Sequence, residues 1–312
     1  MKIVRAFFVI TAFILTVGCE KDPDKLIDQE DSESSHFRPC DNNSSKWISK
    51  VLEYNPAPGQ FINKSLGTPA DCEGIIGKKG MVTLGAFGGS VTFQFDHSVM
   101  NQKGYDFVIH GNAFIGNSEP GIVLVSIDEN GNGIADDEWY ELYGENHSLK
   151  ETTPDYEVVF ERPDDITRAV DIAWTDNLGK KGLFEVAPTL PFHRQTYWPL
   201  FTAEEKASLT FKGTRLANLN MKGDNGKWIN QEAGKGYCDN FSDDYAGSVN
   251  NDADTKDSNK FDISNAINKN GEFINLKGID FIKVYTCVHQ YSGPLGETST
   301  EVCGAISLTC KK

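Results

Sequence analysis

The sequence is short of basic residues, with 30 Lys and Arg against 45 Asp and Glu, for a formal net charge of −15. Lys and Arg supply most of the energy with which proteins hold a phosphate backbone, so this balance argues against a nucleic-acid partner. Long apolar runs are also missing. The one uninterrupted apolar stretch, from Ala6 to Gly18, is too short to cross a bilayer as a helix, so we expect no membrane-spanning segment.

Sequence motifs of common enzymes are absent as well. The chain has no Gly-x-Ser-x-Gly nucleophile elbow, no His-Glu-x-x-His and no phosphate-binding loop. Its six histidines are scattered, and none of its many acidic pairs marks a glycosidase. We therefore expect a binding protein and not an enzyme, and a hydrolase ranks third among the functions considered below.

The first segment has the pattern of an export signal. Lys2 and Arg5 precede the apolar stretch, and Cys19 follows it directly. A basic start, a short apolar middle and a small residue before the cleavage point are typical of secretory signals. A cysteine at that point predicts a lipoprotein, in which residues 1–18 are removed and Cys19 carries the lipid that holds the protein on a membrane. The alternative is an ordinary signal with a chance cysteine.

Residues 19–46 are predicted to form a lipid-anchored flexible tether, because they are polar and include a Ser/Asp/Glu cluster at 29–35. Their acidic start, Glu20–Asp24, resembles the tag that sends Bacteroidetes lipoproteins to the outer leaflet of the outer membrane. This resemblance implies a protein that faces the cell exterior and touches the outer membrane through its lipid alone.

Six cysteines follow the predicted anchor: Cys40, Cys72, Cys238, Cys287, Cys303 and Cys310. An even number in an exported protein allows up to three disulfides, in pairings that the sequence does not choose between. No Cys-x-x-Cys occurs, so neither a zinc knuckle nor a thioredoxin-type site is expected. Buried free thiols are the alternative, since a core of this size does not need disulfides to fold.

From Trp47 onward the chain consists of short strand-like segments separated by Gly, Asn, Asp and Pro. The clearest one alternates polar and apolar residues and places Val91, Phe93 and Phe95 on one face. Such a pattern predicts an all-β sandwich, formed by residues 47–312 as a single domain. The expected strands are at 90–95, 105–110, 121–127, 139–143, 156–160, 208–211, 279–285 and 305–309.

Helix signals are few, and they predict one or two short helices at 202–207 and 262–267. Three long loops complete the predicted domain, at 148–155, 176–199 and the strongly acidic 239–257. Binding residues usually lie on long loops that a rigid sandwich positions, so we expect the binding site there.

The sharpest local motif begins at Asp128. Oxygen-bearing side chains occupy positions 1, 3, 5 and 9, glycine occupies position 6, and the carbonyl of position 7 is a further donor. This spacing wraps a chain around a hard cation. Position 12 is Trp139 in place of the usual bidentate Glu, so Asp137 or Glu138 has to substitute. The predicted calcium ligands are Asp128, Asn130, Asn132, Ile134, Asp136 and Glu138.

Calcium at this motif would stiffen a loop and do no chemistry. The alternative is a metal-free Asn/Gly turn, because the same residues favour tight hairpin connections.

An aromatic and polar stretch, Pro191–Pro199, lies within the predicted loop 176–199. Aromatic walls with a few polar groups are typical of pockets for large flat molecules. The residues that follow two of the predicted strands, 112–114 and 289–291, are expected at the same end of the fold. The alternative is that the aromatic side chains simply close the edge of the sandwich.

Four segments resemble the galactose-binding-type jelly roll of bacterial surface proteins: Leu84–Asp96, Gly104–Asn112, Glu119–Ser126 and Gly278–Tyr285. The resemblance implies that the all-β sandwich is of the jelly-roll type, with long loops.

Four further segments resemble a family of Bacteroidetes cell-surface lipoproteins: Val51–Asn63, Asp128–Leu142, Phe261–Ser264 and Gly296–Val302. This family is associated with vitamin B12 acquisition loci, beside a TonB-dependent cobalamin transporter. The resemblance covers roughly 47–312. It implies that the protein captures cobalamin, or a related corrinoid, and hands it to the transporter, so that cobalamin is a ligand and not a catalytic cofactor.

A corrin ring has broad apolar faces fringed with amides, which suits aromatic side chains together with Asn, Gln and Arg. The main rival is a glycan-binding lipoprotein of a polysaccharide-utilisation system, because aromatic rings stack equally well on sugar faces. On chemistry alone, the predicted ligand-binding residues are Phe114, Trp174, Arg194, Tyr197, Trp198, Gln290 and Tyr291.

Overall fold

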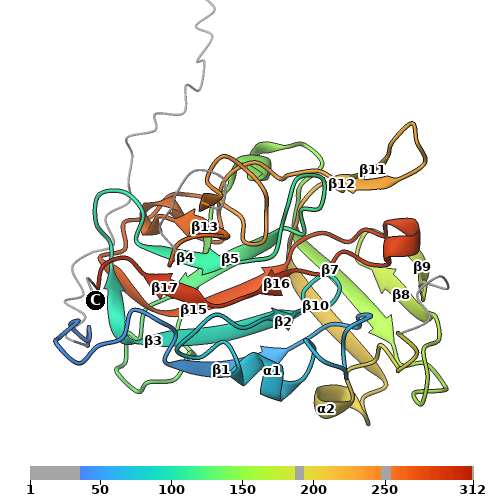
Figure 1. Cartoon of the computed structure of the whole chain (residues 1–312), viewed down its shortest axis with the longest axis horizontal. Helices are drawn as coiled ribbons and strands as arrows, with labels where there is room; N and C mark the ends of the chain where they lie inside the picture. The colour runs from blue at the N-terminus through green and yellow to red at the C-terminus, as the bar shows by residue number, and fades with distance from the viewer. Residues whose placement is uncertain (1–35, 187–192, 247–253, 311–312) are drawn as a thin grey trace, which may run out of the picture.

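The computed structural model describes residues 36–186, 193–246 and 254–310 (Figure 1). The predicted signal segment 1–18, the predicted lipidation residue Cys19 and the predicted tether up to residue 35 lie outside the described residues. Within the described ranges, no helix is long and apolar enough to cross a membrane.

Two antiparallel sheets form the main sandwich (Figure 1). The larger sheet has the strand order β1 (Lys50–Asn55), β3 (Ser90–Met100), β15 (Gly278–Thr286), β5 (Gly121–Ser126), β6 (Trp139–Leu142) and β14 (Ala266–Ile267). The smaller sheet has the order β13 (Ser258–Phe261), β4 (Phe107–His110) and β17 (Ala305–Ser307). The chain passes from β3 to β4 and back to β5, and such crossing between sheets is typical of jelly-roll sandwiches.

The core between these sheets is built by alternation along the strands. Val91, Phe93 and Phe95 of β3 all lie in this core, as the sequence pattern predicts, and Phe107 and Ile109 of β4 belong to the same cluster. Each such side chain contributes about 1.5–3 kcal/mol when it is fully buried. A slip of one residue would move the whole apolar set of β3 out of the core, so burial fixes the register of the central strands.

A second core lies on the opposite face of the larger sheet. There a four-stranded sheet, on the right in Figure 1, packs against the ends of β5 and β15. Its strand order is β10 (Ser208–Arg215), β7 (Thr153–Glu161), β8 (Ile172–Asp176) and β9 (Lys181–Phe184). The ring of Phe87 contacts both layers, with centroids 5.0 Å from Tyr156 of β7 and 6.2 Å from Tyr285 of β15. This end of the molecule therefore has three layers.

The remaining elements are short. They are the hairpin of β11 (Asn220–Lys222) and β12 (Trp228–Asn230), the pair β2 (Val82–Thr83) and β16 (Glu301–Val302), the helices α1 (Pro69–Glu73) and α2 (Leu200–Ala203), and 3₁₀ turns at Glu145–Ser148, Ile263–Asn265 and Gly293–Leu295. The prediction of an all-β sandwich with one or two short helices is confirmed.

Of the two predicted helices, one corresponds to a 3₁₀ turn and the other is displaced along the chain. The signal at 262–267 corresponds to the 3₁₀ turn that begins after Asp262, whose side chain accepts the N–H of Ser264 at 2.8 Å. The signal at 202–207 is displaced, because α2 begins at Leu200 and has no side-chain cap. Helix α1 was not predicted, although Thr68 and Asp71 form a capping box at its start.

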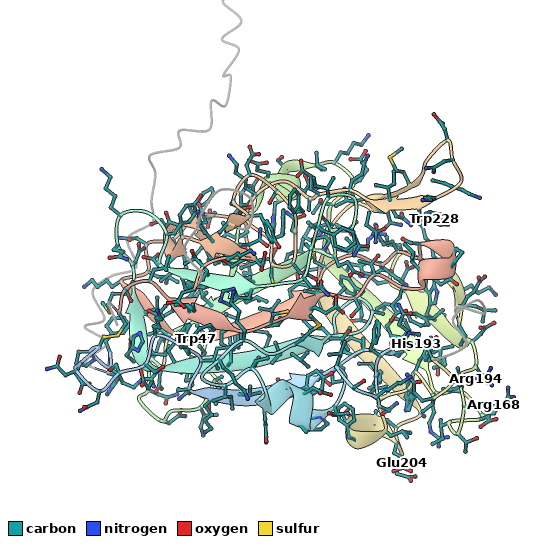
Figure 2. The ribbon with its side chains drawn as sticks, in the orientation of Figure 1. Trp47, Arg168, His193, Arg194, Glu204 and Trp228 are labelled. Carbon is teal, nitrogen blue, oxygen red and sulfur yellow. A yellow bond between two sulfur atoms is a disulfide. The ribbon has the colours of Figure 1, made fainter. Side chains whose placement is uncertain are left out.

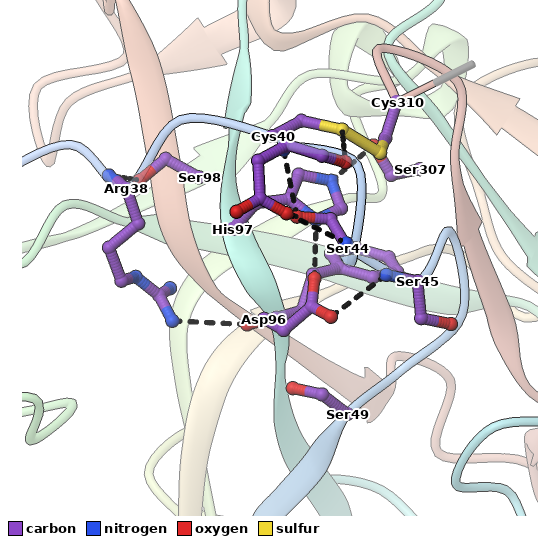
Figure 3. A network of polar contacts seen from close by, with 12 residues as sticks. Arg38, Cys40, Ser44, Ser45, Ser49, Asp96, His97, Ser98, Ser307 and Cys310 are labelled. Carbon is purple, nitrogen blue, oxygen red and sulfur yellow. Dashed lines mark hydrogen bonds and ion pairs between the residues drawn. A yellow bond between two sulfur atoms is a disulfide. The ribbon is translucent and has the colours of Figure 1, made fainter. Parts of the chain in front are cut away.

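The described end of the predicted tether, residues 36–46, packs on β3 and belongs to the folded body (Figure 3). The backbone N–H of Arg38 donates to Ser98 Oγ at 2.8 Å, and its guanidinium donates to the carbonyl of Phe95 at 3.1 Å. Arg38 Nη2 also lies 3.3 Å from a carboxylate oxygen of the buried Asp280. The predicted boundary between 46 and 47 is therefore corrected, because the chain is already fixed to the sandwich at Arg38.

Among the residues that the structure describes, one disulfide forms, between Cys40 and Cys310, whose Cα atoms lie 5.8 Å apart (Figure 3). The other four cysteines among the described residues are buried free thiols: Cys72, Cys238, Cys287 and Cys303. Both sequence-based alternatives therefore apply, each to part of the set. Burial raises the pKa of the Cys72 thiol to about 12, so that it stays protonated and packs as a small apolar residue.

Candidate functional site

A pocket of about 340 Å³, which we call the acidic pocket, is built from segments far apart in the sequence. The 3₁₀ turn Gly293–Leu295 forms part of its wall. Figure 2 labels His193, which lines it, and Trp228, which is so close to the turn that a Cβ added to Gly293 would lie 2.3 Å from the indole Nε1. The lining residues are Gln60, Phe61, Leu66, Met81, Asn112, Asn117, Glu119, His193, Asn230, Leu295, Glu297, Ser299 and Glu301.

Three carboxyl groups meet beside this pocket, and two of them, Glu119 and Glu301, line it. A carboxylate oxygen from each of Glu119, Asp239 and Glu301 lies within 4.8 Å of the others. The backbone fixes Asp239, because its Oδ1 accepts the N–H groups of Asn112 at 2.7 Å and Ala113 at 2.9 Å, and its Oδ2 accepts the N–H of Glu301 at 2.9 Å. Asp239 has a φ of +52°, a left-handed conformation that Asp adopts more readily than most residues.

A fourth carboxyl group, that of Glu297, lines the same pocket and is only 5% exposed. Its Oε1 accepts the backbone N–H of Gln60 at 2.7 Å. Its Oε2 is buried and has no hydrogen-bond partner. Burial raises the pKa of Glu297 to about 8, because the ionised form loses its hydration there.

The cluster carries more negative charge than the protein around it compensates. Burial raises the pKa of Glu119, Asp239 and Glu301, and the neighbouring carboxylates raise those of Glu119 and Glu301 further. None of the ion pairs between described residues includes these three groups or Glu297.

We call the turn Phe114–Asn117 and Leu295 the rim of the acidic pocket, because Asn117 and Leu295 line the pocket. The turn Phe114–Asn117 closes with two backbone hydrogen bonds of 2.8 and 3.3 Å between its end residues. Asn230 of β12 donates its N–H to a carbonyl of this turn at 2.9 Å. At the tip, Phe114 is 61% and Ile115 is 79% exposed, and Leu295 of the pocket wall is 47% exposed. Amide side chains and apolar surface therefore lie side by side at the pocket mouth.

A smaller cavity of about 160 Å³ shares Glu297 with the acidic pocket. Trp174 of β8 lies in its wall beside His289, with the two ring centroids 4.5 Å apart. His289 Nδ1 is 2.8 Å from the hydroxyl of Tyr156. Burial, together with the positive charge of Arg215, lowers the pKa of His289 to about 4. This histidine is therefore neutral at physiological pH. Because the Tyr156 hydroxyl donates to Asp176 Oδ2 at 3.0 Å, the Nδ1–H of neutral His289 donates to the Tyr156 oxygen.

The structure brings together only some of the predicted ligand-binding residues. Trp174, Gln290 and Tyr291 line the smaller cavity, and Phe114 stands on the rim of the acidic pocket next to Asn117. The side chain of Gln290 is engaged within the protein, since its Oε1 accepts the N–H of Leu219 at 2.8 Å.

The aromatic stretch 191–199 contributes less than expected, and residues 191–192 lie outside the described residues. Tyr197 and Trp198 are 1% and 0% exposed and belong to the second core, so they are corrected from pocket residues to core residues. The indole Nε1 of Trp198 donates to the carbonyl of Ala203 at 2.7 Å. Arg194 is exposed and lines neither of the two cavities.

The connection between β5 and β6 folds its predicted calcium ligands toward one another. The N–H of Gly133 donates to Asp128 Oδ2 at 2.9 Å, and the N–H of Ile134 donates to Asn132 Oδ1 at 2.7 Å. The amide Nδ2 of Asn132 lies 3.2 Å from a carboxylate oxygen of Asp136. The loop thus curls into the compact form that its spacing favours.

Two oxygens of this loop fit a cation. Asp128 Oδ1 and Asp137 Oδ2 are buried and have no hydrogen-bond partner, which is unusual for carboxylates unless a cation satisfies them. Asn130 Nδ2 lies 3.3 Å from Asp137 Oδ1, whereas Glu138 Oε2 accepts the hydroxyl of Tyr140 at 3.2 Å. Of the two substitutes considered for position 12, Asp137 is therefore the one that lies with the other loop oxygens.

A third pocket, of about 330 Å³, lies on the face of the larger sheet that carries the four-stranded sheet, and we call it the aromatic groove. Trp139 and Tyr143 provide its rings. Lys283 Nζ lies 4.8 Å from the centre of the Trp139 ring. Glu141 is fixed in its floor, because its Oε1 lies 2.6 Å from His147 Nε2.

The carboxyl cluster was not predicted from the sequence. Glu119 and Glu301 were noticed only within the segments that carry the family resemblance, and Asp239 only as part of an acidic loop. No local spacing connects the three, because the segment before β5, strand β16 and the segment after β12 meet only in the folded chain.

No protein-family model matches the chain, and no curated protein matches it either. We therefore interpret the site from its own residues.

Proposed function

We propose that the protein captures cobalamin, or a related corrinoid, outside the cell and passes it to a TonB-dependent transporter. A lipid on Cys19 holds it at the outer membrane, facing the exterior. The observation that carries this proposal is the exposed apolar rim of the acidic pocket, and the resemblance of the sequence to B12-associated lipoproteins suggests the ligand.

The chemistry of the rim matches a corrinoid. Phe114, Ile115 and Leu295 offer apolar surface to solvent, and clusters of this kind mark binding surfaces. Asn112 and Asn117 provide amides beside them. A corrin has apolar faces fringed with amides, so stacking on the rim and amide–amide hydrogen bonds are both available to it. Binding of this kind requires no reacting group.

The volume of the acidic pocket limits how much of a corrinoid it can enclose. Sites that bury most of a drug-sized ligand enclose roughly 300–1,000 Å³, and a corrinoid is larger than such ligands. The acidic pocket, at about 340 Å³, holds only part of it. The corrinoid therefore lies across the rim and inserts one peripheral group into the pocket, which leaves much of its surface free for a transporter.

Titration of the purified protein with cyanocobalamin tests the proposal. We expect saturable binding at micromolar ligand, seen as heat and as a change in the corrin absorption spectrum. Replacing Phe114 with Ala weakens binding about tenfold or more, because large aromatic side chains dominate such interfaces. Leu178→Ala is the matched control, since Leu178 is 48% exposed but lies in the β8–β9 turn. Absence of heat and of spectral change would remove the proposal.

Glycan capture is the second candidate, and the aromatic groove favours it. Trp139 and Tyr143 with Glu141 and Asn268 combine rings and hydrogen-bonding groups in one cavity, which is the combination that sugars require. An oligosaccharide array compared with a corrinoid panel separates the two functions. Glycan binding that is lost in Trp139→Ala and kept in Phe114→Ala would favour this alternative.

A further inference from the structure

We propose that Glu119, Asp239 and Glu301 bind a hard divalent cation beside the acidic pocket, with Glu297 facing the same site. This cation site is distinct from the loop at 128–138 and does not depend on the identity of the captured ligand.

The three carboxyl groups are spaced closely enough to bind one ion together. One oxygen from each of the three carboxyl groups lies within 4.8 Å of the others, so a single ion between them contacts all three. Ca²⁺–oxygen distances are about 2.3–2.6 Å, which places two ligands of one ion at most about 5 Å apart. Backbone N–H groups hold Asp239 from three directions, so this ligand needs no rearrangement on binding.

The negative charge of the buried cluster favours the binding of a cation. Three or four carboxyl groups lie together in a buried region, and none of them has an ion-pair partner among the described residues. Buried carboxylates that are not compensated cost several kcal/mol each. Protonation or a bound cation has to remove that cost, and a cation removes it for all members of the cluster at once.

Glu297 is an independent indication that something binds here. Its Oε2 is buried and has no partner, although its Oε1 is firmly bonded to the backbone of Gln60. Native proteins leave few buried polar atoms unsatisfied, and each one points to an unseen partner. Glu297 lines both the acidic pocket and the smaller cavity, and its negative charge raises the pKa of Glu119, so it lies close enough to the cluster to share a partner with it.

The donor set selects the class of ion. All the side chains that converge on the cluster present oxygen, and carboxylate oxygens suit Ca²⁺, Mg²⁺ and Mn²⁺. Asn112 and Asn230 line the same pocket and offer further oxygens.

The pocket leaves one side of the ion open. Glu119 is only partly buried, whereas Asp239 is fully buried beneath it. The protein ligands therefore surround the ion from below, and its remaining coordination positions face the pocket. Water, or a carbonyl or hydroxyl oxygen of a bound molecule, completes the coordination there.

The experiment has to separate this site from the predicted calcium-binding loop at 128–138, which we call the calcium loop. Asp136→Asn in the purified full chain weakens the loop and leaves the cluster intact. After removal of metals with a chelator, we add Mn²⁺ and count bound ions from the electron paramagnetic resonance signal of the free ion. We expect Asp136→Asn to bind one Mn²⁺ and the double variant with Glu119→Gln to bind none. Glu205→Gln in the Asp136→Asn chain is the matched control, because Glu205 is exposed.

Thermal stability gives a second readout, because Glu119→Gln should raise Tm in chelator but remove the gain in Tm that Ca²⁺ produces. In chelator, Glu119→Gln raises Tm, because it removes repulsion while keeping the shape of the side chain. Saturating Ca²⁺ raises the Tm of Asp136→Asn by about 3–8 °C, and this gain disappears when Glu119→Gln is added.

Two results would overturn the proposal. One is that Asp136→Asn binds no Mn²⁺ and gains no stability from Ca²⁺ at millimolar concentration, which would mean that protons alone neutralise the cluster. The other is that both responses survive in the double variant, which would place the ion elsewhere. Cobalamin binding is measured separately, so its failure leaves this test unaffected.

Discussion

At the scale of single residues, burial strongly disfavours the charged form of His110 and His289. His110 is buried, its Nδ1 lies 3.2 Å from the carbonyl of Lys256, and its Nε2 has no partner. Burial lowers its pKa to about 4, and the same cause, with Arg215 nearby, lowers that of His289 to about 4. Both rings are positioned as neutral groups, so that protonation of either one opposes folding.

This predicts that acid destabilises the protein through its histidines. An unfolded histidine has a pKa of about 6.5, so the unfolded state takes up these protons first as the pH falls. The stabilisation is fully present above about pH 6.5 and is lost as the pH falls toward 4. Between pH 7 and 5 the loss is about 1–2 kcal/mol per histidine, measurable by urea unfolding.

The variant His289→Gln isolates this effect from the carboxyl groups, because it keeps a polar group beside Tyr156 but does not titrate. Its unfolding free energy should fall less between pH 7 and 5 than that of the wild-type protein. An equal fall in both proteins would contradict the assignment of His289.

At the scale of elements, the parts that could be predicted from the sequence are those whose burial is a local pattern. Strand β5 was expected at 121–127 and runs Gly121–Ser126, and β15 was expected at 279–285 and runs Gly278–Thr286. Both are buried on two sides, so their apolar runs are continuous. Tyr197 and Trp198 show the limit of such patterns, because whether an aromatic residue lines a pocket or fills a core depends on which layer covers it.

The calcium loop allows a prediction for one element. If the loop binds calcium, chelation speeds amide hydrogen exchange in the β5–β6 connection, since Asp128 and Asp137 then repel each other without their ion. In Asp136→Asn, exchange there is fast with or without Ca²⁺. Asp165→Asn, an exposed change elsewhere, is the control. Mass spectrometry of peptides covering 128–138 makes the measurement, and equal exchange in chelator and in Ca²⁺ would identify a metal-free turn.

At the scale of the whole molecule, one covalent bond connects the two ends of the described chain. The Cys40–Cys310 disulfide joins residues 270 positions apart. It closes a loop that contains nearly the entire fold, so it restricts the unfolded chain strongly. The carboxyl cluster belongs to this scale too, because Glu119, Asp239 and Glu301 meet only when the complete topology is formed, and no local pattern in the sequence could have predicted it.

Removing this disulfide should lower stability substantially. We expect the double variant Cys40→Ser, Cys310→Ser to lose about 2–5 kcal/mol of unfolding free energy, measured by urea unfolding without reductant. Reduced wild-type protein should match the variant. The buried thiols provide the control, since Cys72→Ala should respond to reductant as the wild-type protein does. A variant as stable as the oxidised wild type would show that the bond does not form in solution.

The contacts of Arg38 fix the place where the N-terminal part of the chain joins the folded body, and this place bears on how an anchored molecule is oriented. In Figure 1 the N-terminal segment and the end of the chain lie at the left, whereas the 3₁₀ turn Gly293–Leu295 and the β11–β12 hairpin lie at the right. A lipid anchor on Cys19, as we propose, would join the folded body near Arg38, at the edge remote from the acidic pocket. Such an attachment would leave the acidic pocket accessible to solutes that arrive from outside the cell.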